Sequence, residues 1–78
     1  MDAGTYLKSL RKKHRMSLDE VVELSGNQID KTTLSRVERN ERGVSLKNAY
    51  LLSKIYKVDF KTLSEKILRL QGVKSVKR

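Results

Sequence analysis

The sequence predicts an all-α fold of five short helices. It contains no proline and only four glycines, so few positions would interrupt a helix. Apolar residues recur three and four positions apart in separate stretches, which is the spacing of one face of a helix. Serine or aspartate stands before four of these stretches, where its side chain can accept from the first free amides. Seventy-eight residues suffice for one domain with a modest core, and we assign residues 1–72 to that domain and 73–78 to a basic C-terminal tail.

The composition argues against several functional classes. The chain has no cysteine and a lone histidine, His14, so we expect no metal site and no other cofactor. We find no catalytic arrangement of serine, histidine and acid, no paired acids and no glycine-rich phosphate loop, so we expect no enzyme activity. There is no separate sensor domain, so no small-molecule ligand is expected. The chain also has no long apolar run and no secretion signal, which predicts a cytoplasmic protein without a membrane span.

The charge of the chain predicts an anionic partner. The net charge is +9, and such self-repulsion destabilises a compact chain unless its function uses it. The acids are concentrated in residues 17–29, which hold three acids and no lysine or arginine. By contrast, residues 44–78 hold nine lysines and arginines and two acids. Nucleic acid is the leading partner, with an anionic membrane or an acidic protein as alternatives.

The first two helices are expected at about 5–14 and 17–25. The basic run 11–15 at the end of the first helix suits the negative pole of the helix dipole, and it could also contact a phosphate. The second helix begins at a capping box, Ser17-Leu18-Asp19-Glu20, in which Ser17 and Glu20 satisfy each other's amides. Gly26 is the expected left-handed residue just past its end.

The third helix, within residues 30–43, is the most informative element. Asp30 is a good N-cap, and Leu34 and Val37 point inward together. Hydroxyl groups set among lysine and arginine occupy the remaining surface, and this mixture suits phosphates and base edges. The alternative is an ordinary amphipathic helix with a solvated charged side. The outward residues are Lys31, Thr32, Ser35, Arg36 and Arg39.

Two further helices follow a loop at 40–43, in which Asn40 or Gly43 can take positive φ. One is capped by Ser45 and the other by Asp59, and the latter ends near Gly72. Their apolar positions are Leu46, Ala49, Leu52, Ile55 and Tyr56, then Phe60, Leu63, Ile67 and Leu70, with Leu68 off the main stripe.

The last helix carries more apolar residues than one face needs. We therefore expect a homodimer that uses its outward side and the start of the tail. The alternative is that this helix wraps deeply into the monomer core.

Three segments together resemble the Xre/Cro family of helix-turn-helix repressors. They are Met16–Val21, Leu34–Arg39 and residues 45–58, and the resemblance covers residues 5 to about 65. It implies a lambda-repressor-like, five-helix DNA-binding domain with helices two and three as the helix-turn-helix. In such proteins the third helix lies in the major groove while the second crosses the backbone. The expected partner is thus double-stranded DNA, and the expected function is transcriptional regulation, for instance as a repressor on a palindromic operator.

The resemblance also assigns residues. Base reading falls on the outer face of the third helix, where Arg36 can make a bidentate contact to guanine. The alternative is that Arg36 only pairs with Asp30 or Glu41 on the surface. The base-reading set is Lys31, Thr32, Ser35 and Arg36, and the phosphate set is Lys12, Ser17, Thr33, Arg39 and Arg42.

A structural ion pair between Arg11 and Glu38 is expected to fix the third helix to the first. The alternative is an exposed pair that contributes little to stability.

Two features depart from the family. Leu18 stands where glutamine is usual, and the turn is longer by Asn27-Gln28, which affects how the third helix enters the groove.

A competing interpretation is a protein-interaction module, such as an antitoxin-like partner whose basic surface meets an acidic protein. RNA binding is less favoured, because three tyrosines and one phenylalanine leave few aromatic rings for base stacking.

Overall fold

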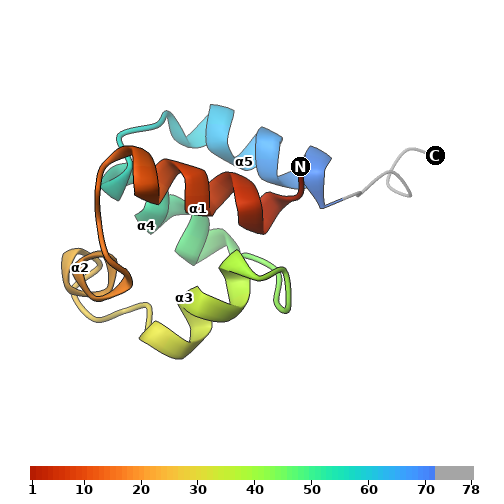
Figure 1. Cartoon of the computed structure of the whole chain (residues 1–78). Helices are drawn as coiled ribbons and strands as arrows, with labels where there is room; N and C mark the ends of the chain where they lie inside the picture. The colour runs from red at the N-terminus through yellow and green to blue at the C-terminus, as the bar shows by residue number, and fades with distance from the viewer. Residues whose placement is uncertain (72–78) are drawn as a thin grey trace.

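The computed structural model describes residues 1–71, and it confirms the all-α prediction with five helices (Figure 1). None of these helices is long and apolar enough to cross a membrane. The predicted basic tail, residues 73–78, lies outside the described part of the chain. The helices are α1 (Ala3–Lys13), α2 (Leu18–Leu24), α3 (Lys31–Glu38), α4 (Leu46–Ile55) and α5 (Phe60–Leu70).

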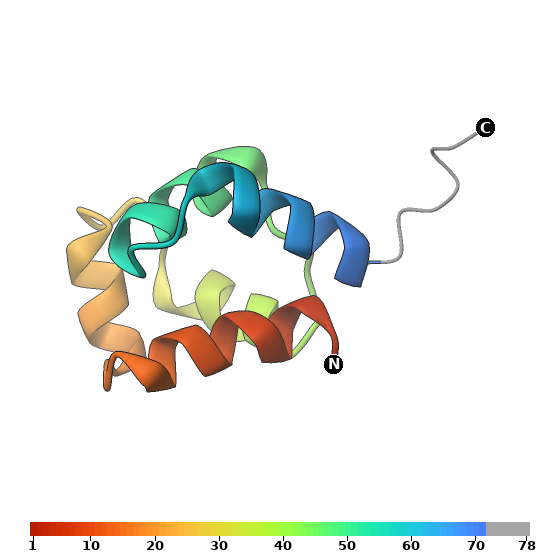
Figure 2. The same ribbon diagram turned by 90° about the horizontal axis from the view of Figure 1, so that it is seen from above.

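The helices are arranged around α1. Helix α1 packs against both α3 and α5, while α2 packs against α3 and α4 packs against α5. In Figure 1, α5 lies above α1, and α2 and α3 lie below it. The view from above in Figure 2 shows α2 at the end of the molecule away from the last turn of α5. Helices α2 and α3 thus lie together on one side of α1. Helix α5 packs against α1 and carries α4 with it.

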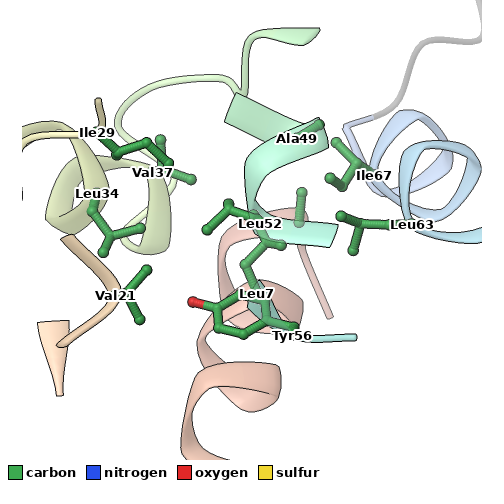
Figure 3. Packing of buried hydrophobic residues seen from close by; sticks show 11 residues of the cluster. Leu7, Val21, Ile29, Leu34, Val37, Ala49, Leu52, Tyr56, Leu63 and Ile67 are labelled. Carbon is green, nitrogen blue, oxygen red and sulfur yellow. The ribbon is translucent and has the colours of Figure 1, made fainter. Parts of the chain in front are cut away.

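A single hydrophobic core joins all five helices (Figure 3). Burying each of its larger aliphatic side chains contributes about 1.5–3 kcal/mol. The helices depend on this packing, because helices of this length are unstable alone. Ile29, from the connection between α2 and α3, is 2% exposed and fixes that turn to the core. The other buried members are Ala3, Leu7, Val21, Leu34, Val37, Ala49, Leu52, Tyr56, Leu63 and Ile67.

Local capping explains where the helices start. Ser17, Asp30, Ser45 and Asp59 are N-caps as the sequence predicts, and the capping box of α2 forms in full. The predicted start of α1 at Thr5 is wrong by two residues. Asp2 is a fifth N-cap, and its carboxylate accepts from the amide of Thr5 at 2.8 Å.

The ends of α1 to α4 share one geometry. A residue with positive φ follows each helix, and the next amide donates to the carbonyl five residues back, as in a Schellman motif. Gly26 takes this conformation as predicted, and in the loop after α3 it is Asn40 rather than Gly43 that does so. Arg15 and Lys57 also have positive φ, although they carry a Cβ atom that disfavours this conformation. Their residue types did not predict it.

The apolar residues of α4 and α5 follow the expected pattern with one exception, Leu46. Leu46 was expected on the inner face of α4, but it is 75% exposed, because it is the first residue of the helix and lies at the rim of a groove. In α5, Ile67 of the apolar stripe is buried in the core, whereas Leu68, which lies off that stripe, is 53% exposed. Only Leu68 of this pair is therefore available to a partner.

Candidate nucleic-acid interface

Helix α3 presents one fixed face and one free face. Leu34, Val37 and Glu38 are buried. On the opposite side Lys31, Thr32, Arg36 and Arg39 are exposed, and Ser35 is half-buried. The predicted base-reading residues are therefore brought together on one surface of one helix.

The N-terminus of α3 is held by Asp30. Its carboxylate accepts from the amide of Thr33 at 3.2 Å and from the Thr33 hydroxyl at 2.7 Å. These two hydrogen bonds lower the pKa of Asp30, so it is ionised at neutral pH. Because the Thr33 hydroxyl already donates to Asp30, it would have to exchange this bond before it could donate to a phosphate.

The C-terminal end of α3 is held by Arg11. The Arg11 Nε donates to Glu38 Oε2 at 2.8 Å and its Nη2 donates to Oε1 at 2.9 Å, while Nη1 donates to the carbonyl of Met16 at 2.9 Å. The two side chains are 9% and 5% exposed. The structure thus brings together the two residues that the resemblance pairs, and the pair is buried. The hydrogen bond to Glu38 raises the pKa of Arg11, which keeps this buried guanidinium charged.

The same ion pair lies close to a buried phenol. The Tyr56 hydroxyl is buried and has no hydrogen-bond partner among residues 1–71. Burial, with a smaller contribution from the charge of Glu38, raises the pKa of Tyr56 far above its ordinary value. Tyr56 is therefore neutral at any pH at which the domain is used.

Two hollows lie beside the start of α3. The larger, of about 570 Å³, lies where the end of α1 and the starts of α2 and α3 meet, and it gathers Lys12, Ser17 and Lys31 of the predicted site. Arg15, which is not among the predicted site residues, also lines this hollow. Arg11, Lys12 and Arg15 belong to the basic run at the end of α1, and the packing of the helices brings Lys31 of α3 to the same hollow.

The second hollow, of about 290 Å³, lies between α2 and α3. Lys31, Thr32, Ser35 and Arg39 line it, together with Leu18 at the start of α2. Lys31 borders both hollows and therefore connects them.

Thr33, Arg36 and Arg42 of the predicted site line neither hollow. Arg42 lies beyond the C-terminal end of α3, in a hollow shared with Asn40, Gly43 and the end of α5. The predicted phosphate residues are thus distributed on both sides of the free face of α3, with Lys12 and Ser17 on one side and Arg42 on the other.

Several charged groups of this surface are paired with each other. Lys31 Nζ lies 3.3 Å from Asp19 Oδ1, and Arg39 Nε lies 3.2 Å from Glu41 Oε2. Both pairs are more than half exposed, so each contributes about 0–1 kcal/mol and can be exchanged for a contact to DNA. Arg36, for which pairing with Asp30 or Glu41 was the alternative, forms no salt bridge within residues 1–71.

The comparison with protein families agrees with this geometry. A family model described as "Helix-turn-helix" matches residues 7–63, most of the chain. The chain therefore belongs to the helix-turn-helix family of the Xre/Cro type, whose domains bind DNA. The match spans the helices from α1 to the start of α5, including both helices of the motif. Comparison with curated proteins and with solved structures gave no match.

Proposed function

We propose that this chain is a sequence-specific transcriptional regulator that reads an operator through the free face of α3 and acts as a cytoplasmic repressor. The observation that supports this most is the contrast between the two faces of α3. One is fixed by the core and by the Arg11–Glu38 pair, and the other is exposed and rich in hydrogen-bond donors. A rigidly held helix with a free polar face is what major-groove reading requires.

The proposed roles follow from side-chain chemistry. Arg36, exposed and without a salt bridge to the described residues, can donate two hydrogen bonds to guanine O6 and N7. Lys31 can contact the same atoms once it leaves Asp19. Thr32 and Ser35 offer hydroxyl groups to base edges.

Phosphate contacts are proposed on both flanks of the reading helix. They would set its register on the duplex without carrying sequence information. The Ser17 oxygen accepts from the amide of Glu20, and its hydroxyl proton remains available for a phosphate. The full proposed set is Lys12, Ser17, Thr33, Arg39 and Arg42.

Two alanine variants test this division of roles on a site selected from random DNA. Arg36→Ala should cost about 1–3 kcal/mol on the selected site and relax the preference at one base pair. Lys12→Ala should weaken selected and random DNA alike and make the dependence of affinity on salt shallower by about one ion. Binding isotherms at several salt concentrations measure both effects. Equal losses on selected and random DNA for Arg36→Ala would contradict its base-reading role.

We further propose that the chain binds a palindromic operator as a two-fold dimer. One helix reads few base pairs, and two copies about 34 Å apart are the usual route to specificity. An apolar groove of about 170 Å³ lies between α4 and α5, with the exposed Leu46 and Leu68 on its rim and Ala49 and Ile67 inside. A second copy could place its own Leu68 there, which would cover both leucines in a symmetric contact.

The dimer is tested by one charge substitution on the rim. Leu68→Glu should leave the fold intact, since the residue is 53% exposed, and should give a monomer with much weaker operator binding. The matched control is Leu24→Glu, at a leucine on α2 that is 59% exposed and outside the groove. Sedimentation at tens of micromolar and footprinting supply the measurements. A wild-type monomer that protects a single half-site would rule out this assembly.

A further inference from the structure

An aliphatic side chain lies among the polar residues of the proposed reading face. Leu18 is the wholly apolar member of the five residues that line the hollow between α2 and α3. It is the first residue of α2, and its inner side packs against the core while the side chain as a whole is only half-buried. The Ser17–Glu20 capping box fixes the turn that carries it. The exposed part of Leu18 is therefore held in a defined position beside α3.

Both cations that line this hollow are paired with an acid. Lys31 Nζ lies 3.3 Å from Asp19 Oδ1, and Arg39 Nε lies 3.2 Å from Glu41 Oε2, so the cations do not leave an excess of positive charge around Leu18. Leu18 itself cannot donate a hydrogen bond to a phosphate oxygen. The Leu18 side chain is thus unsuited to a phosphate contact and well suited to an apolar one.

Duplex DNA carries one apolar group on its major-groove edge, the C5-methyl of thymine, with the O4 acceptor beside it. Thr32, in the same hollow, has a methyl group, and Ser35 and Lys31 have donors. We propose that Leu18 and Thr32 form the two sides of a site for a thymine methyl group, while Ser35 or Lys31 donates to O4 of the same base. This inference rests on the proposed function, because it names one base that the operator must contain in each half-site.

The test replaces thymine by deoxyuridine, which removes only the methyl group, at one position of the selected site at a time. For the wild-type protein, one position in each half-site should lose about fourfold in affinity, the value for burying one methyl group. In Leu18→Ala the same replacement should cost less than about twofold. Thr32→Ser, which removes the other methyl group and keeps the hydroxyl, should also reduce the loss.

The readout is the ratio of thymine to uracil affinities within one variant, so partial unfolding of a variant cancels from it. The matched control is Leu24→Ala, the same substitution at the other end of α2, which should retain the fourfold ratio.

Three outcomes overturn the proposal, and they separate it from the proposed function. In the first, the wild type prefers one sequence, but no thymine is selected in the half-sites or no replacement by uracil lowers its affinity by more than about twofold. The methyl site is then absent, and the regulator function stands. A fourfold loss that persists in Leu18→Ala shows that other residues read the methyl group. The absence of any preferred sequence overturns both proposals.

Discussion

Glu38→Ala should lower the free energy of unfolding by about 3–5 kcal/mol, because it leaves the buried Arg11 guanidinium without its counter-charge. Two hydrogen bonds of 2.8 and 2.9 Å are lost with the carboxylate, and the side chain of Arg11 is only 9% exposed, so water cannot replace them fully. In a small domain this loss is a large part of the total stability. Urea unfolding followed by circular dichroism measures it.

A second acid near the end of α3 supplies the control. Glu41→Ala breaks an exposed pair with Arg39, whose side chains are 58% and 54% exposed, and should cost about 0–1 kcal/mol. Replacing both members of the buried pair by apolar residues, as in Arg11→Met with Glu38→Leu, should recover much of the loss. If Glu38→Ala and Glu41→Ala unfold at the same urea concentration, the pair does not stabilise the domain in solution.

The helices could be predicted from the sequence because their signals are local. A cap such as Ser17 or Asp30 acts on amides two or three residues away, so its effect does not depend on the rest of the fold. The start of α1 was missed although its cap, Asp2, is also local. Asp2 stands before Ala3 and Gly4, and no apolar periodicity marks this turn as helical.

The candidate site was harder to predict, because it depends on how helices pack against one another. The outer face of α3 follows from helical spacing, and its base-reading role was implied only by the resemblance. The contact between Lys31 and Asp19 joins two helices across the turn, and the position of Leu18 beside Thr32 requires the packing of α2 on α3. Neither contact can be predicted from the spacing of residues along the chain. Leu18 could be noted as a departure from the family, but its neighbours come only from the structure.

The backbone of α1 approaches the end of α3 closely at Gly4. A Cβ atom added at Gly4 would lie 2.4 Å from the carbonyl oxygen of Val37 and 2.6 Å from that of Glu38. The amide of Gly4 also donates to Asn40 Oδ1 at 3.0 Å, so this turn of α1 is held against α3 by a hydrogen bond as well. Only glycine allows the two helices to approach so closely.

Gly4→Ala should therefore lower the free energy of unfolding by about 2–3 kcal/mol. Overpacking usually costs about 1–3 kcal/mol, and here the atoms in the way are backbone atoms that cannot turn aside, so the cost lies at the upper end or beyond. The better helix propensity of alanine offsets only about 0.5–1 kcal/mol of it. The same denaturant unfolding measures the change.

The control is Gly43→Ala, in the loop after α3. The nearest atom to an added Cβ there is Gln71 Oε1 at 3.6 Å, an ordinary contact, so stability should change by no more than about 0.5 kcal/mol. Because the approach of α1 to α3 also sets the position of Arg11 against Glu38, Gly4→Ala combined with Glu38→Ala should destabilise by less than the two single changes added together. Equal stability of the two glycine variants would show that α1 can move away from α3 at little cost, and the rigid support of α3 would then have to come from α2 and the core.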